Sequence, residues 1–189
     1  AFRMPVDSRF APPLDPSLPK EKRLTNYDNV KHLLEDVEWE LHPGALASYG
    51  DWQVETREEF CYAAAARVKT VREVCESGKY DAIVLLGGGE PGFLESREIT
   101  RKFDMVVTSC AFSQMHTASM LGNRFSVIDF AESHNMYYYN LVNQHRFDRR
   151  CASIRNIPYY HPRPGYSGEV YLGEEKKKAL KGERSEAVE

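Results

Sequence analysis

Three short apolar runs, each followed by a helix-like segment, dominate the middle of the chain. They cover Ala82–Leu86, Met105–Ser109 and Phe125–Phe130. None shows the strict alternation of apolar and polar residues that marks a sheet with one solvated face, so each run predicts a buried strand. Because strands and helices alternate along the chain, the pattern predicts an α/β fold in which one parallel sheet contains all three runs.

A long amphipathic helix is expected before the first of these strands. Its apolar residues recur at three- and four-residue spacing: Phe60, Ala64, Val68, Val71 and Cys75, with Gly78 ending the helix. Cys61 and Cys75 are expected near its core-facing side. The order of elements suggests a first α/β lobe over residues 1–108 and a second over residues 109–189. The closing residues resemble the first turns of an unfinished helix, so the second lobe is expected to continue beyond Glu189.

Composition excludes several classes of function. The 189 residues carry a net charge of −3, which argues against a nucleic-acid partner. The four cysteines lie far apart without the paired spacing of a zinc site, so we expect no metal and reduced thiols. No apolar stretch is long enough for a membrane span. These features together favour a cytoplasmic protein without a membrane partner.

In parallel α/β sheets, ligands bind beyond the carboxyl ends of the strands. The loops that follow Leu86, Ser109 and Phe130 are therefore the candidate site. We expect residues 87–92 to face a cleft there.

The first of these loops contains a G-x-G-x-x-G pattern, formed by Gly87, Gly89 and Gly92. A dinucleotide-binding loop has the same spacing, but its helix N-terminus must accept a pyrophosphate, and an acid at the end of the next strand holds a ribose. Here Glu90 puts a negative charge inside the turn, and the next strand ends at Thr108-Ser109-Cys110 without an acid. The pattern is therefore interpreted as a tight strand-to-helix turn, and no nicotinamide or flavin cofactor is expected.

A wider set of motifs gives a more specific indication. The segments "YDAIVLLGGGEPGFLESRE", "MHTASMLGNRFSVI" and "RCASIRNI" follow one another in the chain. This series resembles the Asp/Glu/hydantoin racemase family, in which a strand, Cys-x-Gly-Asp-Pro-Gly and a helix precede a His-x-Ala-x-x-Leu-Gly-x-Arg-Phe block. The resemblance implies two flavodoxin-like lobes with the active site in the cleft between them. It also implies cofactor-independent chemistry beside the carbonyl of a small carboxylate or cyclic amide.

The family mechanism removes a proton from one face of a carbon and delivers another to the opposite face, using two thiols. Backbone N–H groups and hydroxyls hold the oxygen on which charge develops. The resemblance assigns this second task to Gly87, Gly88, Gly89, Thr108 and Ser109. It also places Asp7 and Ser8 in a substrate-binding loop, although an ordinary polar turn explains that pair equally well.

One departure from the family pattern bears directly on the reaction. Gly87 stands where the family carries its first catalytic cysteine. A glycine at this position resembles the arylmalonate decarboxylase branch, in which a single thiol protonates an enediolate. Three alternatives thus stay open: a racemase or isomerase, a decarboxylase (a lyase), and a binding protein that has kept the pocket without the chemistry. Whether the chain forms a homo-oligomer is also open.

Individual side chains each have a functional and a structural interpretation. Cys110 is a candidate proton carrier, although free cysteines are more often small buried hydrophobes. Glu90 is a candidate general base, although an acid at a helix N-terminus is stabilised there without any catalytic role. His116 is a candidate substrate-binding residue, and the alternative is a packed or capping histidine. The ring cluster Tyr137–Tyr139 is expected at an interface or at the cleft.

The exclusion of a dinucleotide can be tested directly. Titration with NAD(H) at moderate concentration should leave the thermal unfolding midpoint unchanged, because Glu90 repels the pyrophosphate. A saturable rise in that midpoint, competed by a small carboxylate, would overturn the expectation.

Overall fold

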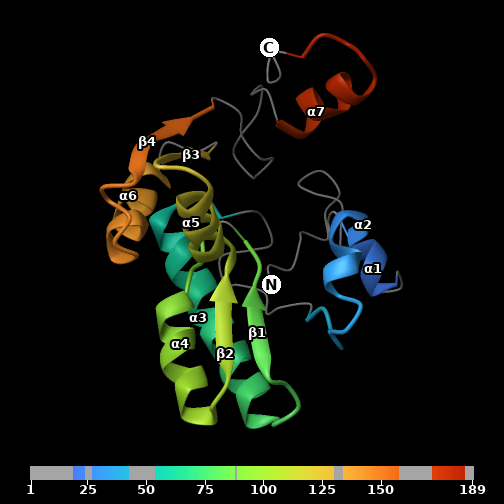
Figure 1. Cartoon of the computed structure of the whole chain (residues 1–189), viewed down its shortest axis with the longest axis vertical. Coiled ribbons are helices and arrows are strands. Elements are labelled where there is room, and N and C mark those ends of the chain that lie inside the picture. Colours follow the sequence, from blue (N-terminus) through green and yellow to red (C-terminus); the bar gives the residue numbers. More distant parts are fainter. Residues whose placement is uncertain are drawn as a thin grey trace.

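A computed structural model describes residues 19–23, 27–42, 54–87, 89–129, 134–157 and 172–185. Asp7, Ser8 and Gly88, three of the expected substrate-binding residues, lie outside these ranges. The smaller elements near the two ends of the chain are α1 (Lys20–Arg23), α2 (Tyr27–Val30), the 3-10 helix η1 (Lys31–Leu33) and α7 (Leu172–Leu180). Figure 1 shows these small helices beside and above a central body made of the remaining elements.

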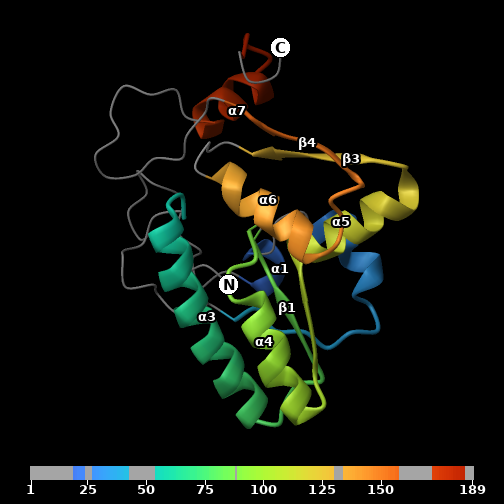
Figure 2. The same ribbon diagram turned by 90° about the vertical axis from the view of Figure 1, so that its left-hand side faces the viewer.

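The first sheet of the central body pairs β1 (Ala82–Leu85) with β2 (Val106–Ser109) in parallel. The register sets Leu85 opposite Ser109, so both strands end at the same edge. The helices α3 (Arg57–Glu76) and α4 (Phe93–Thr100), the latter extended by the 3-10 helix η2 (Arg101–Phe103), lie together along one side of the sheet (Figures 1 and 2). The core between these layers consists of Val71, Cys75, Leu85, Phe93, Ile99 and Val107.

The second sheet pairs β3 (Phe125–Asp129) with β4 (Cys151–Asn156), also in parallel. Two helices pack on it: α5 (Cys110–Leu121) and α6 (His134–Gln144). Their buried side chains form a second core, made of Ala111, Met115, Leu141 and Val142. Figure 2 shows α6 between the second sheet and the α3–α4 layer of the first.

The expectation of one sheet containing all three apolar runs is wrong, although both observed sheets are parallel. In the described part of the chain β3 pairs with β4 and not with β2. Its residues alternate in burial, with Phe125 and Val127 turned to the second core while Ile128 is 70% exposed. The side chains on its covered face pack with those of α5 and α6, and β4, which follows α6 in the chain, supplies the neighbouring strand.

Local signals account for both ends of α3. Thr56 caps the helix through the backbone N–H of Glu59, and the Glu59 carboxylate accepts from the backbone N–H of Thr56, which completes a capping box. At the other end Gly78 adopts φ +63°, the left-handed conformation that commonly follows a helix. Cys75 is buried as expected. The expectation for Cys61 is wrong: it is exposed, because it lies two turns before Val68, beyond the end of the first core, and lines a cavity there.

None of the described helices combines the length and the apolar character needed to cross a bilayer.

The core of the first sheet gives a matched pair of substitutions. Phe93 is 2% exposed in the α3–α4 layer, whereas its neighbour Leu94 is 42% exposed. Phe93→Ala should lower the free energy of unfolding by about 3–5 kcal/mol, because it opens a cavity in a close-packed core. Leu94→Ala should cost clearly less. Equal losses of unfolding free energy in denaturant titration would contradict the burial of Phe93 in this core.

Candidate active site at the carboxyl ends of β1 and β2

The loop of residues 86–92 leaves the end of β1 and enters α4. Because β1 and β2 are parallel and in register, this loop lies beside Ser109 and the first turn of α5. Side chains from α3, from α6 and from the end of β2, together with a backbone N–H of α5, hold the loop at separate points, so its conformation depends on most of the central body.

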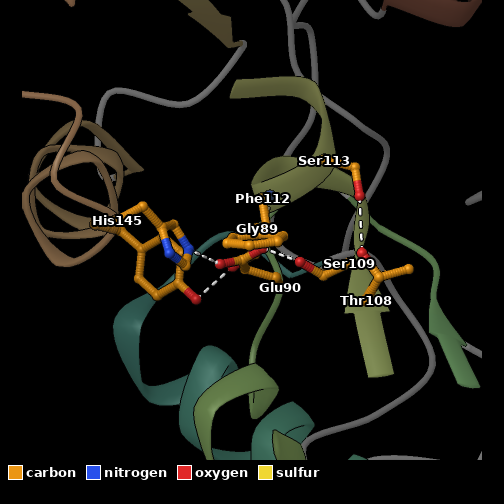
Figure 3. Close-up of polar contacts among 8 residues, drawn as sticks. Gly89, Glu90, Thr108, Ser109, Phe112, Ser113 and His145 are labelled. Atoms are coloured by element: carbon orange, nitrogen blue, oxygen red, sulfur yellow. Dashed lines mark hydrogen bonds and ion pairs between the residues drawn. The ribbon is translucent and has the colours of Figure 1, made fainter. Parts of the chain in front are cut away.

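The carboxylate of Glu90 makes the most concentrated set of contacts in this region (Figure 3). Its Oε2 accepts hydrogen bonds from the hydroxyl of Ser109 and from the backbone N–H of Phe112, the latter at 2.9 Å. Its Oε1 lies against Nε2 of His145, the residue that follows α6. The side chains of Glu90 and His145 are 0% and 3% exposed. The three donors therefore surround a carboxylate that is fully withdrawn from solvent.

The position of Glu90 relative to α5 explains why a buried acid is tolerated. The first N–H groups of a helix have no partner within the helix, and an anion is stabilised near them. Phe112 lies in the first turn of α5, so its N–H is one of these groups. Glu90 itself adopts φ +43°, a conformation uncommon for a residue with a side chain. The surrounding contacts must therefore hold the backbone in a sparsely populated region.

Arg67 of α3 binds the same loop from the other side. Its guanidinium donates to the carbonyl oxygens of Leu86 and Pro91, at 2.8 and 3.0 Å. Burial lowers the pKa of Arg67, while the neighbouring Tyr137, Cys110 and Glu90 raise it. A buried cation thus lies among the acidic groups of the candidate site and ties both ends of the loop to α3.

Tyr137 of α6 provides the third attachment. Its hydroxyl donates to the carbonyl oxygen of Gly89, and its ring stacks on Phe60 with the centroids 3.9 Å apart. Burial is the main cause that raises the pKa of Tyr137, and the nearby Glu90 raises it further. The hydroxyl therefore stays protonated and able to donate at neutral pH.

The three glycines of the G-x-G-x-x-G pattern each meet a steric demand of the fold. Gly87 adopts φ +113°, which side-chain-bearing residues rarely reach. A Cβ at Gly89 would lie 2.6 Å from Cε1 of Phe60. Gly92 has φ +79°, and a Cβ there would lie 3.0 Å from the carbonyl oxygen of Ala64 in α3. The pattern thus follows from packing, as the interpretation of a tight turn requires.

The hydroxyl of Thr108 at the end of β2, and the hydroxyl of Ser113 and the thiol of Cys110 in α5, are less buried than the Glu90 carboxylate. The hydroxyls of Thr108 and Ser113 lie 2.8 Å apart and are accessible (Figure 3). Cys110 begins α5 as a free, half-buried thiol. His116 lies further along the same helix and is exposed, with its ring edge-on to Phe112 and Phe147. Thr108, Ser109 and Cys110 are thus together at one edge, and His116 is a packed ring whose proposed role in substrate binding stays a prediction.

A cavity of about 320 Å³ adjoins the loop, between α3, the start of α4 and α6. Its lining includes Arg57, Phe60, Glu90, Tyr137 and Gln144. The expected cleft beside the glycine loop is therefore present for the part that includes Glu90. Thr108, Ser109 and Cys110 are not among the residues that line this cavity.

No group of three His, Cys, Asp or Glu side chains placed to hold a metal ion occurs within the ranges that the structure describes.

Comparison with known proteins identifies relatives at the level of sequence and of fold. The hydantoin racemase of Pseudomonas sp. (strain NS671) is 32% identical over 111 residues, which cover 57% of this chain and 43% of that protein. The allantoin racemase from Klebsiella pneumoniae superposes with a TM-score of 0.53 at 20% identity, over 72% of this chain and 51% of the other. The chain thus spans about half the length of these relatives. No family model matches it.

The expected resemblance to the Asp/Glu/hydantoin racemase family is confirmed by the sequence similarity to a hydantoin racemase. The expected α/β class is confirmed with it, because the structural match extends over most of the chain.

The sequence interpretation of this candidate site missed three residues: Arg67, Tyr137 as a hydrogen-bond donor to the loop, and His145. One of them carried a readable signal, since Arg67 occupies the buried stripe of α3 between Phe60 and Cys75. A lone cation on such a stripe requires buried acceptors. His145 follows its helix and lies 55 residues from Glu90 in sequence, so no local pattern pairs the two.

The contact between Gly89 and Phe60 can be tested by substitution. Gly89→Ala should destabilise the protein by about 1–3 kcal/mol, the usual cost of overpacking, because the new Cβ meets the Phe60 ring. Gly122→Ala is the matched control, since its Cβ would approach nothing closer than 3.6 Å. Phe60→Leu in the Gly89→Ala background should recover part of the loss. Equal stability of the two glycine variants in urea would refute the contact.

Proposed function

We propose that this chain supplies the substrate-binding edge of a cofactor-independent racemase or isomerase that acts on a carbon beside the carbonyl of a cyclic amide or carboxylate. The sequence similarity to a hydantoin racemase carries the proposal. It is supported by the presence of Gly87, Thr108, Ser109 and Cys110 at the shared carboxyl edge of β1 and β2. We further propose a cytoplasmic location and a small molecule as the substrate.

In this proposal the oxygen of the substrate is held at the start of α5. Proton removal beside a carbonyl leaves negative charge on the oxygen, and preorganised donors stabilise that charge most effectively. The accessible hydroxyls of Thr108 and Ser113 are suitable donors, as are the N–H groups of the first turn of α5 other than that of Phe112, which binds Glu90. The backbone of Gly87 and Gly89 approaches the same edge without side chains in the way.

Cys110 is the proposed proton carrier. It is a free and partly accessible thiol in the first turn of a helix. Its place beside the hydroxyls of Thr108 and Ser113 would put the thiol close to a carbon whose carbonyl oxygen they bind. The arrangement offers one thiol at this edge, and Gly87 offers none.

That single thiol supports a second candidate function. A decarboxylase of the arylmalonate type needs one thiol to protonate an enediolate, and the glycine at position 87 fits that branch. A binding protein with the same pocket would have neither activity. The three alternatives differ in measurable products, so one set of assays separates them.

The proposed chemistry predicts exchange of the carbon-bound proton in heavy water. Incubation with allantoin or an L-5-substituted hydantoin should remove the C5–H proton NMR signal at least about a hundredfold faster than buffer, the lower end of what positioned acid–base catalysis contributes. Cys110→Ala should return the rate to background, and Cys151→Ala, at a half-buried thiol that begins β4, should not. Release of carbon dioxide from an arylmalonate without exchange would instead establish the decarboxylase. Binding without either reaction would establish the binding protein.

Position 87 allows a test of the second thiol. Gly87→Cys and Gly87→Ala both force a side chain into φ +113° and should lose a similar amount of stability, about 1–3 kcal/mol. Only the cysteine adds a thiol on the face where the related racemases carry one. Exchange by Gly87→Cys should therefore exceed that of Gly87→Ala. Equal rates at equal stability would show that the strained backbone keeps the new thiol away from the substrate.

A further inference from the structure

We infer that Glu90 is a positioning residue, which fixes the glycine loop against the start of α5, and that it does not carry the proton. The inference rests on the proposed function, because the part it positions is the proposed oxyanion-binding edge. It assigns to the buried acid a task different from that of a general base.

The Glu90 carboxylate is buried, and both of its oxygens already have hydrogen-bond partners. A general base must bring an oxygen within hydrogen-bond reach of the proton that it removes. The Glu90 side chain has no exposed surface, and its two oxygens already face three donors, from Ser109, Phe112 and His145. Substrate would have to displace one of these donors to reach the carboxylate.

The glycine loop is held from two sides by different residues. On one side Arg67 and Tyr137 hold the carbonyl oxygens of Leu86, Pro91 and Gly89, which ties the loop to α3 and α6. On the other side the carboxylate of Glu90 reaches Ser109 and the backbone of Phe112. These two hydrogen bonds of Glu90 join the loop to the end of β2 and to α5. The carboxylate thus sets the spacing between the loop and Cys110.

His145 gives this spacing a second anchor. It lies just beyond α6, and its ring centroid is 5.1 Å from that of Phe112 and 6.0 Å from that of Phe93. The imidazole is therefore wedged between α4 and α5 while it contacts Oε1 of Glu90. One carboxylate thus connects the loop to the end of β2, to α5 and to the residue that follows α6.

Glutamine at position 90 separates positioning from proton transfer. Its Oε1 can accept from Ser109 and Phe112, while its Nε2 donates to His145 after a change of imidazole tautomer. Glu90→Gln thus keeps the geometry and removes the basic group. Glu90→Ala removes both.

The kinetic experiment compares these two variants in the exchange assay. Glu90→Gln should keep kcat within about tenfold of wild type, whereas Glu90→Ala should lose about a hundredfold or more in kcat, the usual effect of a misplaced site. Glu98→Gln and Glu98→Ala, at an exposed residue of α4, are the matched controls. A loss of several hundredfold in Glu90→Gln with an unchanged KM would make Glu90 the base and overturn the inference. If Glu90→Ala does not fold, Glu90→Asp replaces it: activity in the order Gln above Asp supports positioning, and the reverse order overturns it.

An NMR measurement tests the inference without any activity. In wild type the ¹⁵N signals of His145 should show a proton on Nε2, and in Glu90→Gln the proton should move to Nδ1. The backbone amide shifts of Gly87, Gly89 and Cys110 should stay close to wild type in Glu90→Gln and move in Glu90→Ala or Glu90→Asp. Unchanged amides in all variants would overturn positioning. Absence of exchange in wild type, with the NMR result as expected, would refute the proposed function alone.

Discussion

The withdrawal of the Glu90 carboxylate from water is the constraint on which the candidate site depends. A buried carboxylate is tolerated only when donors replace its hydration, and removing one partner of a buried ion pair typically costs about 3–5 kcal/mol. Here the replacements come from the end of β2, the first turn of α5 and the residue after α6. Each of these segments must therefore be in place for the loop after β1 to adopt its shape. The strained backbone of Glu90 is the local sign of this dependence.

The glycine loop illustrates how one spacing serves two kinds of site. In a dinucleotide fold, glycines allow a tight turn, close approach to a pyrophosphate and packing of helix on strand. In this chain the close approach is to the ring of Phe60, and the close packing is of Gly92 against α3. The acid in the turn faces the N-terminus of α5 instead of a phosphate. The spacing therefore reports backbone geometry, and the charge within it decides which kind of ligand is possible.

Sequence reasoning succeeded where the deciding interactions are local. The apolar runs gave parallel strands, Gly78 ended α3, and the shared carboxyl edge of β1 and β2 brought Gly87, Thr108, Ser109 and Cys110 together. It failed where pairing depends on distant partners. The assignment of β3 to the first sheet is wrong because its partner is β4, which follows a further helix, and an apolar run does not specify its neighbouring strand. His145 could not be paired with Glu90, because nothing in a local pattern measures a separation of 55 residues. Arg67 was the one missed residue with a local sign, a cation on a buried helix stripe.

The place of α6 bears on how the chain divides into units. Its inner side belongs to the second core, through Leu141 and Val142, yet Tyr137 from the same helix binds the loop of the first sheet. Phe60 of α3 stacks on that tyrosine and also meets the ring of His134 edge-on. The contact between α3, which packs on the first sheet, and α6, which packs on the second, is therefore apolar as well as polar. A division between residues 108 and 109 stays a prediction, and it would separate units that share this contact. The glycine loop is held by both helices, through Arg67 of α3 and Tyr137 of α6. Any shift of α6 relative to α3 must therefore change the spacing at the proposed oxyanion-binding edge. Substrate affinity and the relative position of the two sheets are for that reason expected to be linked through Tyr137 and Glu90.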